Sequence, residues 1–140
     1  MILEARHLRQ GMNPVVVVKL GNQKRRTVVR EGTDCPVYNE YFVFDFTGDL
    51  EKLLSTRITI ALYSRNCLRQ LKFYGSTVFE VEAVWEQPDH QYYHKWAMLG
   101  DPKSLSSEPK GYVKCNVAVR AKGEKVRIYP ETEGEDDIEG

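Results

Sequence analysis

Short runs of alternating apolar and polar residues, separated by turn signals, recur through this 140-residue chain and constrain its fold more than any other feature. Such runs are typical of strands with one buried face, and no long segment with a helical period competes with them. We predict eight strands joined by mostly short loops: Ile2–Leu8, Pro14–Leu20, Gln23–Arg30, Tyr38–Phe46, Arg57–Ser64, Tyr74–Val84, Tyr93–Leu99 and Gly111–Lys122. This pattern predicts an all-β fold, an eight-stranded antiparallel β-sandwich.

Valines and turn residues define one connection between neighbouring strands. The run Val15–Val18 places β-branched residues on both faces of the strand Pro14–Leu20, as expected of a buried strand. Gly21 and Asn22 follow it, and both residue types tolerate a positive φ, so they predict a two-residue hairpin turn. The segment Asp49–Ser55 is expected to form a helical turn, because its three leucines fall on one side.

The length fits one domain that can bury a core without disulfides or metals. Core signals stop near residue 125, so we expect the folded domain to span residues 1–125 and an acidic, disordered linker to span residues 126–140. Glu4 and Arg6 interrupt the apolar start, which argues against a secretory signal, and no apolar run reaches the roughly 18 residues of a membrane-spanning helix. Three cysteines without CxxC spacing indicate reduced thiols in an intracellular compartment: Cys35, Cys67 and Cys115.

The net charge of zero hides an asymmetry along the chain. Residues 131–140 contain six acidic residues and no cation, which leaves 20 cations and 14 acids in the rest of the chain. A basic body indicates an anionic partner for that body. A solvated linker remains the alternative reading of the acidic end.

The sequence offers little support for catalysis or metal binding. His90 and His94 are four residues apart, but no third ligand lies at a usable spacing and the segment falls at a loop-to-strand boundary. Nucleophile elbows, P-loops and dinucleotide-binding motifs are absent from the sequence. We therefore expect neither an enzyme nor a resident cofactor or metal.

Two basic segments are candidate binding sites. The strand Gln23–Arg30 carries Lys24, Arg25 and Arg26; the first and third share a face and Arg25 takes the other. Anionic lipid and a sheet edge kept soluble by charge both explain this strand. Nucleic acid is disfavoured, because no aromatic residue stands among these cations to stack on bases. The second segment is the loop within Leu62–Gly75, which is both basic and apolar.

Three segments together resemble C2 domains, the calcium-dependent phospholipid-binding sandwiches. Asn13–Val18 resembles their Asp-Pro-Tyr-Val-Lys-Val segment, and Thr33–Phe44, the most specific match, resembles Thr-x-Asn-Pro-x-Trp-Asn-Glu-x-Phe-x-Phe. Ile58–Gly75 resembles the strand and third loop of the family. The match covers about residues 1–121, and the strand order resembles type II topology.

More narrowly, the chain resembles the second C2 domain of ferlins, and among them the otoferlin-like members. Cys35–Phe46, His94–Pro102 and Gly111–Val119 carry this resemblance, and Glu135–Glu139 resembles the segment that leads into the next ferlin module. The resemblance implies a module of a large, multi-C2, tail-anchored protein at the cytoplasmic face of vesicle or plasma membranes. It also implies a role in vesicle fusion or membrane repair.

The calcium-binding positions of the family are altered in this chain. Family sites use about five aspartates, because Ca²⁺ takes 6–8 hard oxygen ligands. Here the corresponding positions are Asn13, Ser64, Asn66 and Lys72. Hydroxyl and amide groups supply no charge and an ammonium repels a divalent cation, so we expect no calcium binding through these loops.

The same substitutions leave a basic loop end that suits an anionic membrane. Each cation near an anionic leaflet contributes about 1 kcal/mol, and an inserted leucine about 1.5–3 kcal/mol if fully buried. We therefore expect weak, calcium-independent docking on anionic phospholipid through a set of loop and strand residues: Arg9, Lys24, Arg25, Arg26, Arg65, Leu68, Arg69 and Lys72. The alternative is a protein-interaction or spacer module that contacts other C2 domains or trafficking proteins and binds no lipid itself.

Overall fold

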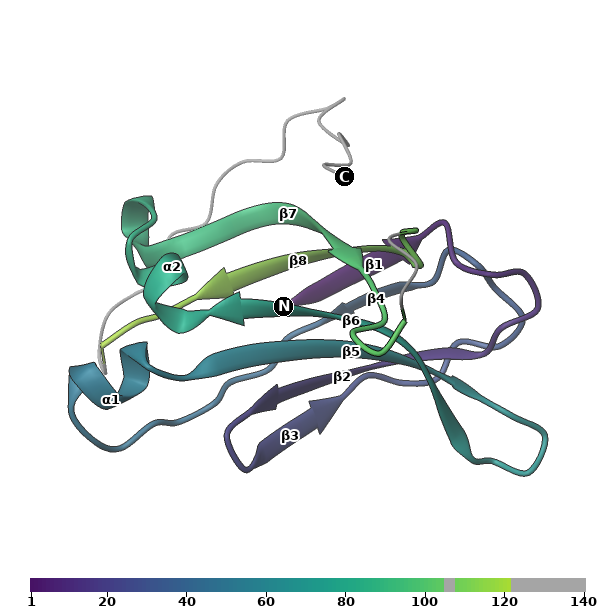
Figure 1. Cartoon of the computed structure of the whole chain (residues 1–140), viewed down its shortest axis with the longest axis horizontal. Helices are drawn as coiled ribbons and strands as arrows, with labels where there is room; N and C mark the ends of the chain where they lie inside the picture. The colour runs from purple at the N-terminus through teal and green to yellow at the C-terminus, as the bar shows by residue number, and fades with distance from the viewer. Residues whose placement is uncertain (105–107, 122–140) are drawn as a thin grey trace.

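The computed structural model describes residues 1–104 and 108–121, and this part of the chain forms eight strands in two four-stranded antiparallel sheets (Figure 1). One sheet has the order β4-β1-β8-β7, and the other has the order β3-β2-β5-β6. The predicted eight-stranded antiparallel sandwich is confirmed. The elements in chain order are β1 (Ile2–Arg6), β2 (Pro14–Leu20), β3 (Gln23–Arg26), β4 (Val37–Glu40), α1 (Leu50–Leu54), β5 (Arg57–Arg65), β6 (Leu71–Glu80), α2 (Val81–Trp85), η1 (Pro88–His90), β7 (Gln91–Leu99) and β8 (Gly111–Ala118).

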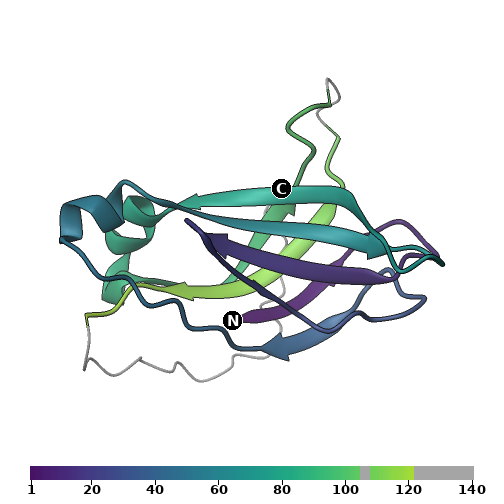
Figure 2. The same ribbon diagram turned by 90° about the horizontal axis from the view of Figure 1, so that it is seen from below.

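The main core lies between the two sheets, which Figure 2 shows as separate layers. Val16, Ile60 and Leu62 face it from one sheet, and Leu99 and Val113 face it from the other; each is at most 1% exposed. The alternation that predicted these strands arises from this arrangement, because every second side chain of a strand points into the core.

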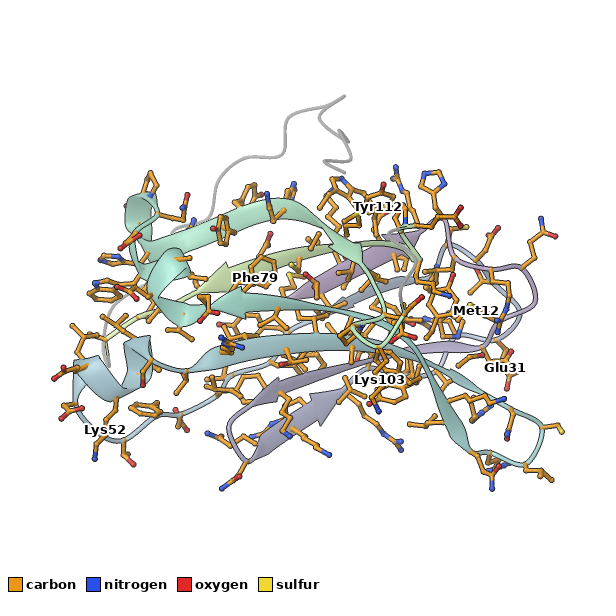
Figure 3. The ribbon with its side chains drawn as sticks, in the orientation of Figure 1. Met12, Glu31, Lys52, Phe79, Lys103 and Tyr112 are labelled. Atoms are coloured by element: carbon orange, nitrogen blue, oxygen red, sulfur yellow. The ribbon has the colours of Figure 1, made fainter. Side chains whose placement is uncertain are left out.

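A second cluster closes the end of the sandwich where α1 and α2 lie. Leu20, Val81, Val84 and Val119 are buried there, and Phe79 (Figure 3) packs against them. This cluster explains a wrong prediction: the strand expected over Tyr74–Val84 is β6 followed by the helix α2. Val81 and Val84 are spaced i, i+3, so a helical turn buries both on one side, whereas a strand would place them on opposite faces.

Two further strands are shorter than predicted. The Gln23–Arg30 segment is a strand only to Arg26, because Thr27 turns inward, where its Oγ1 accepts a hydrogen bond from Val16 N at 2.9 Å. The Tyr38–Phe46 segment is a strand only to Glu40, where the last pair of its ladder joins Ile2 and Glu40.

The other strands follow their predicted bounds more closely. The strands β1, β2, β5 and β7 begin and end within two residues of the predicted positions. The strand β8 begins at Gly111 as predicted and ends at Ala118, whereas its predicted end, Lys122, lies outside the described residues.

The connections predicted from local signals are present. Leu20 pairs with Gln23 across a two-residue turn in which Gly21 has a φ of +57°. The helical turn within Asp49–Ser55 is α1, and the Asp49 side chain accepts a hydrogen bond from Lys52 N at its start. These local signals therefore predicted the connections correctly.

The two long sides of the sandwich are closed differently. On one side, Ser76 bridges Gly100, and Gly75 permits this approach, because a Cβ there would lie 3.2 Å from the Cβ of Lys110. On the other side, side chains make the links: Val28 N donates to the Glu40 carboxylate at 2.9 Å, and the buried Tyr38 hydroxyl donates to a β2 carbonyl at 2.6 Å. Burial raises the pKa of Tyr38 above its usual range, so it stays a donor.

Candidate functional site

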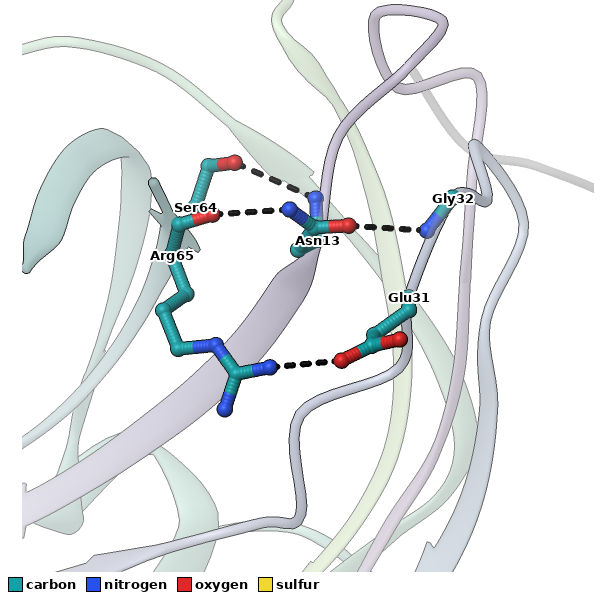
Figure 4. Close-up of polar contacts among 5 residues, drawn as sticks. All are labelled: Asn13, Glu31, Gly32, Ser64 and Arg65. Atoms are coloured by element: carbon teal, nitrogen blue, oxygen red, sulfur yellow. Dashed lines mark hydrogen bonds and ion pairs between the residues drawn. The ribbon is translucent and has the colours of Figure 1, made fainter. Parts of the chain in front are cut away.

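Three loops meet at the end of the sandwich opposite the helices, and Asn13 joins them (Figure 4). Its Nδ2 donates to the Arg65 carbonyl at 2.8 Å, and its Oδ1 accepts from Gly32 N at 2.9 Å. Its own backbone N donates to the Ser64 hydroxyl at 3.2 Å. One amide side chain therefore links the loop after β1, the loop before β4 and the end of β5.

Beside this link, an ion pair connects the end of β5 with the loop before β4. Arg65 and Glu31 approach to 2.7 Å, with side chains 29% and 73% exposed. Such an exposed pair contributes at most about 1 kcal/mol. The pair leaves the predicted excess of positive charge at the loop ends unchanged, because it removes one charge of each sign.

The hairpin between β5 and β6 has an ordered five-residue tip, Asn66–Gln70. Asn66 Oδ1 accepts hydrogen bonds from Leu68 N at 3.0 Å and Gln70 N at 2.9 Å. Arg69 has a φ of +61°, and its N donates to the Asn66 carbonyl. This tip leaves Leu68 73% exposed, and Arg69, the next residue in the chain, is also exposed.

The residues at the family's calcium positions do not fit that ion. Asn13 and Asn66 already use their side-chain oxygens as acceptors of backbone hydrogen bonds. Ser64 lies opposite Lys72 in the β5–β6 pairing, which places an ammonium-bearing residue beside the hydroxyl. Within the part of the chain that the structure describes, no group of three acidic, histidine or cysteine residues is arranged to hold a metal. Ca²⁺ needs a set of charged oxygen ligands, and none of Asn13, Ser64, Asn66 and Lys72 supplies a carboxylate.

A basic depression lies on the outer face of the β3-β2-β5-β6 sheet. It has a volume of about 430 Å³ and is lined by three cations of β3 and three apolar or aromatic residues of the other strands: Lys24, Arg25, Arg26, Val17, Tyr63 and Leu71. Lys24 and Arg26 pair with Lys19 and Val17 of β2, so all four are on the outer face of this sheet. Arg25 takes the other side, and its guanidinium lies 5.3 Å from the centre of the Phe44 ring. The alternation of faces predicted for these three cations is confirmed.

The basic depression is continuous with the hairpin. Tyr63 and Leu71 belong to the two arms, β5 and β6, whose tip carries Leu68. The Tyr63 and Phe73 rings meet edge to face, with centroids 5.7 Å apart, and Phe73 is 43% exposed. The structure thus brings together the two predicted basic segments on one surface, and adds an aromatic and aliphatic floor.

That floor was missed from the sequence, although a signal for it existed. The alternation of β5 places Tyr63 on the face opposite Ile60 and Leu62, which are buried. Phe73 pairs with Tyr63 across the hairpin, but this pairing depends on the register, which is irregular between Leu62 and Tyr63. Arg9 stands apart from the basic depression, with its guanidinium 5.7 Å from the centre of the Tyr74 ring.

His90 and His94 stack on aromatic rings, and only one of the three cysteines is buried. His90 stacks on Trp85 with ring centroids 3.7 Å apart, and His94 stacks on Tyr93 at 4.0 Å. Cys35 and Cys67 are exposed thiols, whereas burial raises the pKa of the Cys115 thiol to about 12.

Among the described helices, none has the length and apolar character to cross a membrane. The helices α1 and α2 have five residues each.

Comparison with protein families gives two matches along the chain. A model described as C2 domain matches residues 1–99, and a model described as FerI (NUC094) domain matches residues 100–140. The strand β8 lies beyond the first match yet pairs with both β1 and β7, so the sandwich itself extends to at least Ala118.

Relatives of known name are much longer than this chain. It is 35% identical over 125 residues to mouse Fer-1-like protein 4 and 30% identical over 125 residues to human myoferlin. These alignments cover 88% and 89% of this chain but only 6% of each relative.

Solved structures support the fold alone, because their sequence identity is low. A C2 domain of plant Extended Synaptotagmin 1 matches with a TM-score of 0.66 at 18% identity, over 82% of this chain and 86% of that one. The calcium-bound pair of C2 domains of Extended-Synaptotagmin 2 matches with a TM-score of 0.66 at 19% identity, over 84% and 39% of the two chains.

Proposed function

Since this chain belongs to the C2 domain family, as the C2 domain that precedes a FerI domain in a ferlin, we propose that it docks weakly on anionic phospholipid membranes without calcium. It acts as a binding module rather than an enzyme. The observation that carries the proposal is one continuous surface with two outward-facing cations of β3, Lys24 and Arg26, an apolar floor and a protruding leucine.

The energies of this surface suit a reversible contact. Each cation near an anionic leaflet contributes about 1 kcal/mol, and Leu68 contributes about 1.5–3 kcal/mol if it is fully buried among lipids. A few such contacts give weak binding for one module, which gains strength when several modules of one protein act together. Fixed cations supply the positive charge that calcium supplies elsewhere in the family.

The place in the cell is part of the same proposal. We assign the chain to the second C2 domain of an otoferlin-like ferlin that is tail-anchored, with this module at the cytoplasmic face of a vesicle or plasma membrane. Its role there is in vesicle fusion or membrane repair. The three sequence segments that resemble this domain and the FerI match that follows support the assignment.

Co-sedimentation with vesicles tests the lipid-binding surface. We expect binding to phosphatidylserine vesicles and much weaker binding to neutral phosphatidylcholine vesicles. Lys24→Gln with Arg26→Gln should weaken binding about 30-fold, because these two outward-facing cations contribute about 2 kcal/mol. Lys52→Gln with Arg57→Gln, two exposed cations near α1, should change it little. Equal binding to both vesicle types, or equal loss in both double variants, would overturn the proposal.

A protein-interaction module is the second candidate, and one observation favours it. Three apolar residues in β4 and the segment that follows it are largely exposed: Val37 at 53%, Tyr41 at 63% and Val43 at 57%. Exposed apolar residues gathered in one segment often mark a protein contact. Failure to bind any vesicle at low salt, with a protein partner whose binding is lost in Tyr41→Ser, would favour this candidate.

A further inference from the structure

The basic depression has an acidic counterpart in the same chain. We propose that the acidic segment, residues 131–139, docks in the basic depression and competes there with anionic lipid. The docking is a property of this chain alone, whereas the competition rests on the proposed function. The contact would make membrane binding adjustable, because anything that removes the segment frees the surface.

Charge within the basic depression favours an anionic occupant. Lys24 lies directly opposite Lys19 in the β2–β3 pairing, and like charges in such a pair repel each other. Among the described residues, neither Lys24 nor Arg26 makes an ion pair. Carboxylates placed between these cations relieve the repulsion. By contrast, Arg6 on the other sheet is paired with Glu4 at 2.6 Å.

The order of residues in the acidic segment fits the lining of the basic depression. Ile138 is flanked by Asp137 and Glu139, so an apolar side chain lies between two carboxylates. The floor provides Tyr63 and Leu71, the latter 36% exposed, with the cations of β3 at the rim. An anionic lipid presents the same combination, a negative headgroup next to apolar chains, so the two occupants compete for the same contacts.

The segment can reach the basic depression. Val119 packs in the same cluster as Leu20, which is the residue that leads into the turn before β3. The ten Cα–Cα steps from Ala121 to Glu131 span up to roughly 33 Å when extended, whereas the four residues of β3 span about 13 Å. A tether this short gives an effective concentration of about millimolar, so even a weak contact is populated.

Paramagnetic broadening in NMR spectra locates the segment without any lipid. The full chain carries Gly134→Cys with Cys35→Ser and Cys67→Ser, and a nitroxide label on the new thiol. We expect broadened amide signals for Lys24, Arg25 and Arg26, and recovery of these signals in high salt, which screens the contact. Unchanged signals in β3, or stronger broadening in β7 and β8, would overturn the docking.

Vesicle binding measures the competition with a matched pair of variants. One variant neutralises three acids of the segment, Glu135→Gln, Asp136→Asn and Asp137→Asn. The control neutralises three exposed acids on or beside α1 and α2, with the same change of net charge: Glu51→Gln, Glu82→Gln and Glu86→Gln. A segment that occupies the basic depression about four-fifths of the time lowers apparent affinity about fivefold. The first variant should therefore bind phosphatidylserine vesicles about fivefold more tightly than the control.

The two measurements separate failure of this inference from failure of the proposed function. Broadening in β3 without vesicle binding by any variant would support the docking and contradict the lipid role. Vesicle binding that is equal in both variants, with no broadening in β3, would leave the lipid role intact and overturn the docking.

Discussion

At the scale of single residues, Asn13 joins the loops at the end of the sandwich opposite the helices. Its side chain bonds to one backbone donor and one backbone acceptor on two different loops. An amide can do this because it carries both kinds of group, whereas a carboxylate only accepts. Asn13 thus supplies a direct link between loops.

Substituting Asn13 should destabilise the fold. Asn13→Ala removes both side-chain hydrogen bonds, and we expect a loss of about 1–3 kcal/mol in the free energy of unfolding, measured by urea denaturation. Asn13→Asp should also be destabilising, because its carboxylate would face the Arg65 carbonyl. Asn22→Ala, at an exposed turn position, is the control with an expected change near zero. Unchanged stability in both Asn13 variants would show that the link is unimportant.

Cys115 predicts a loss of stability at alkaline pH. Burial raises the pKa of its thiol from 9.0 to about 12, so between these values the unfolded chain releases a proton that the folded chain keeps. The free energy of unfolding should therefore fall above pH 9 by about 1.4 kcal/mol per pH unit from this group. Cys115→Ala should have a shallower decline in pH-dependent urea denaturation. An equal slope in both proteins would contradict this explanation.

At the scale of elements, the β5–β6 hairpin positions the exposed leucine. Its tip is ordered by Asn66, and its arms contribute Tyr63 and Leu71 to the basic depression. The sequence predicted a charged, apolar loop between two strands here, because alternation and glycine marked its boundaries. The structure extends the second strand to Leu71, so the connection is shorter than predicted. The alternation of β5 places Tyr63 on the outer face, but the pairing of Tyr63 with Phe73 depends on the register between two strands, which the sequence does not reveal.

The difference between local sequence signals and contacts between distant segments also explains which parts of the fold were predictable. Strands with a strong local signal, the valine run of β2 and the alternation of β5, were located to within one residue. The helix α2 was missed because its two buried valines follow a strand without any turn residue, and only packing against Leu20 and Val119 favours the helix. The early end of β4 depends on its partner strand, which the local sequence does not reveal.

Leu68 should contribute to membrane binding through insertion. Leu68→Ser should weaken binding to phosphatidylserine vesicles about tenfold, because a buried leucine contributes about 1.5–3 kcal/mol. Leu50→Ser is a matched control, since Leu50 is also exposed, at 48%, but belongs to α1 at the opposite end. Equal weakening in both variants would indicate a general change in stability or solubility rather than insertion.

At the scale of the whole molecule, charge is distributed between a basic body and an acidic end. The body has cations on the β3 strand and at the loop end, whereas residues 131–140 hold six acids. Attraction between an exposed cationic surface and an anionic leaflet is screened by salt. The whole chain is therefore expected to bind membranes in a way that depends on ionic strength.

Salt dependence gives a prediction at this scale. Raising the salt concentration from low to physiological values should release most of the protein from phosphatidylserine vesicles in co-sedimentation. The contribution of Leu68 should persist, because burial of apolar surface is not screened. Binding that is insensitive to salt would indicate an apolar contact instead of an electrostatic one.

Calorimetric titration with Ca²⁺, with vesicle binding measured in parallel in calcium and in chelator, tests the central claim most directly. The loop residues provide no set of charged oxygen ligands, so we predict no heat of calcium binding at physiological concentrations. Binding to phosphatidylserine vesicles should be equal in calcium and in chelator. A measurable heat of binding, together with vesicle binding that disappears in chelator, would contradict the account of a calcium-independent module.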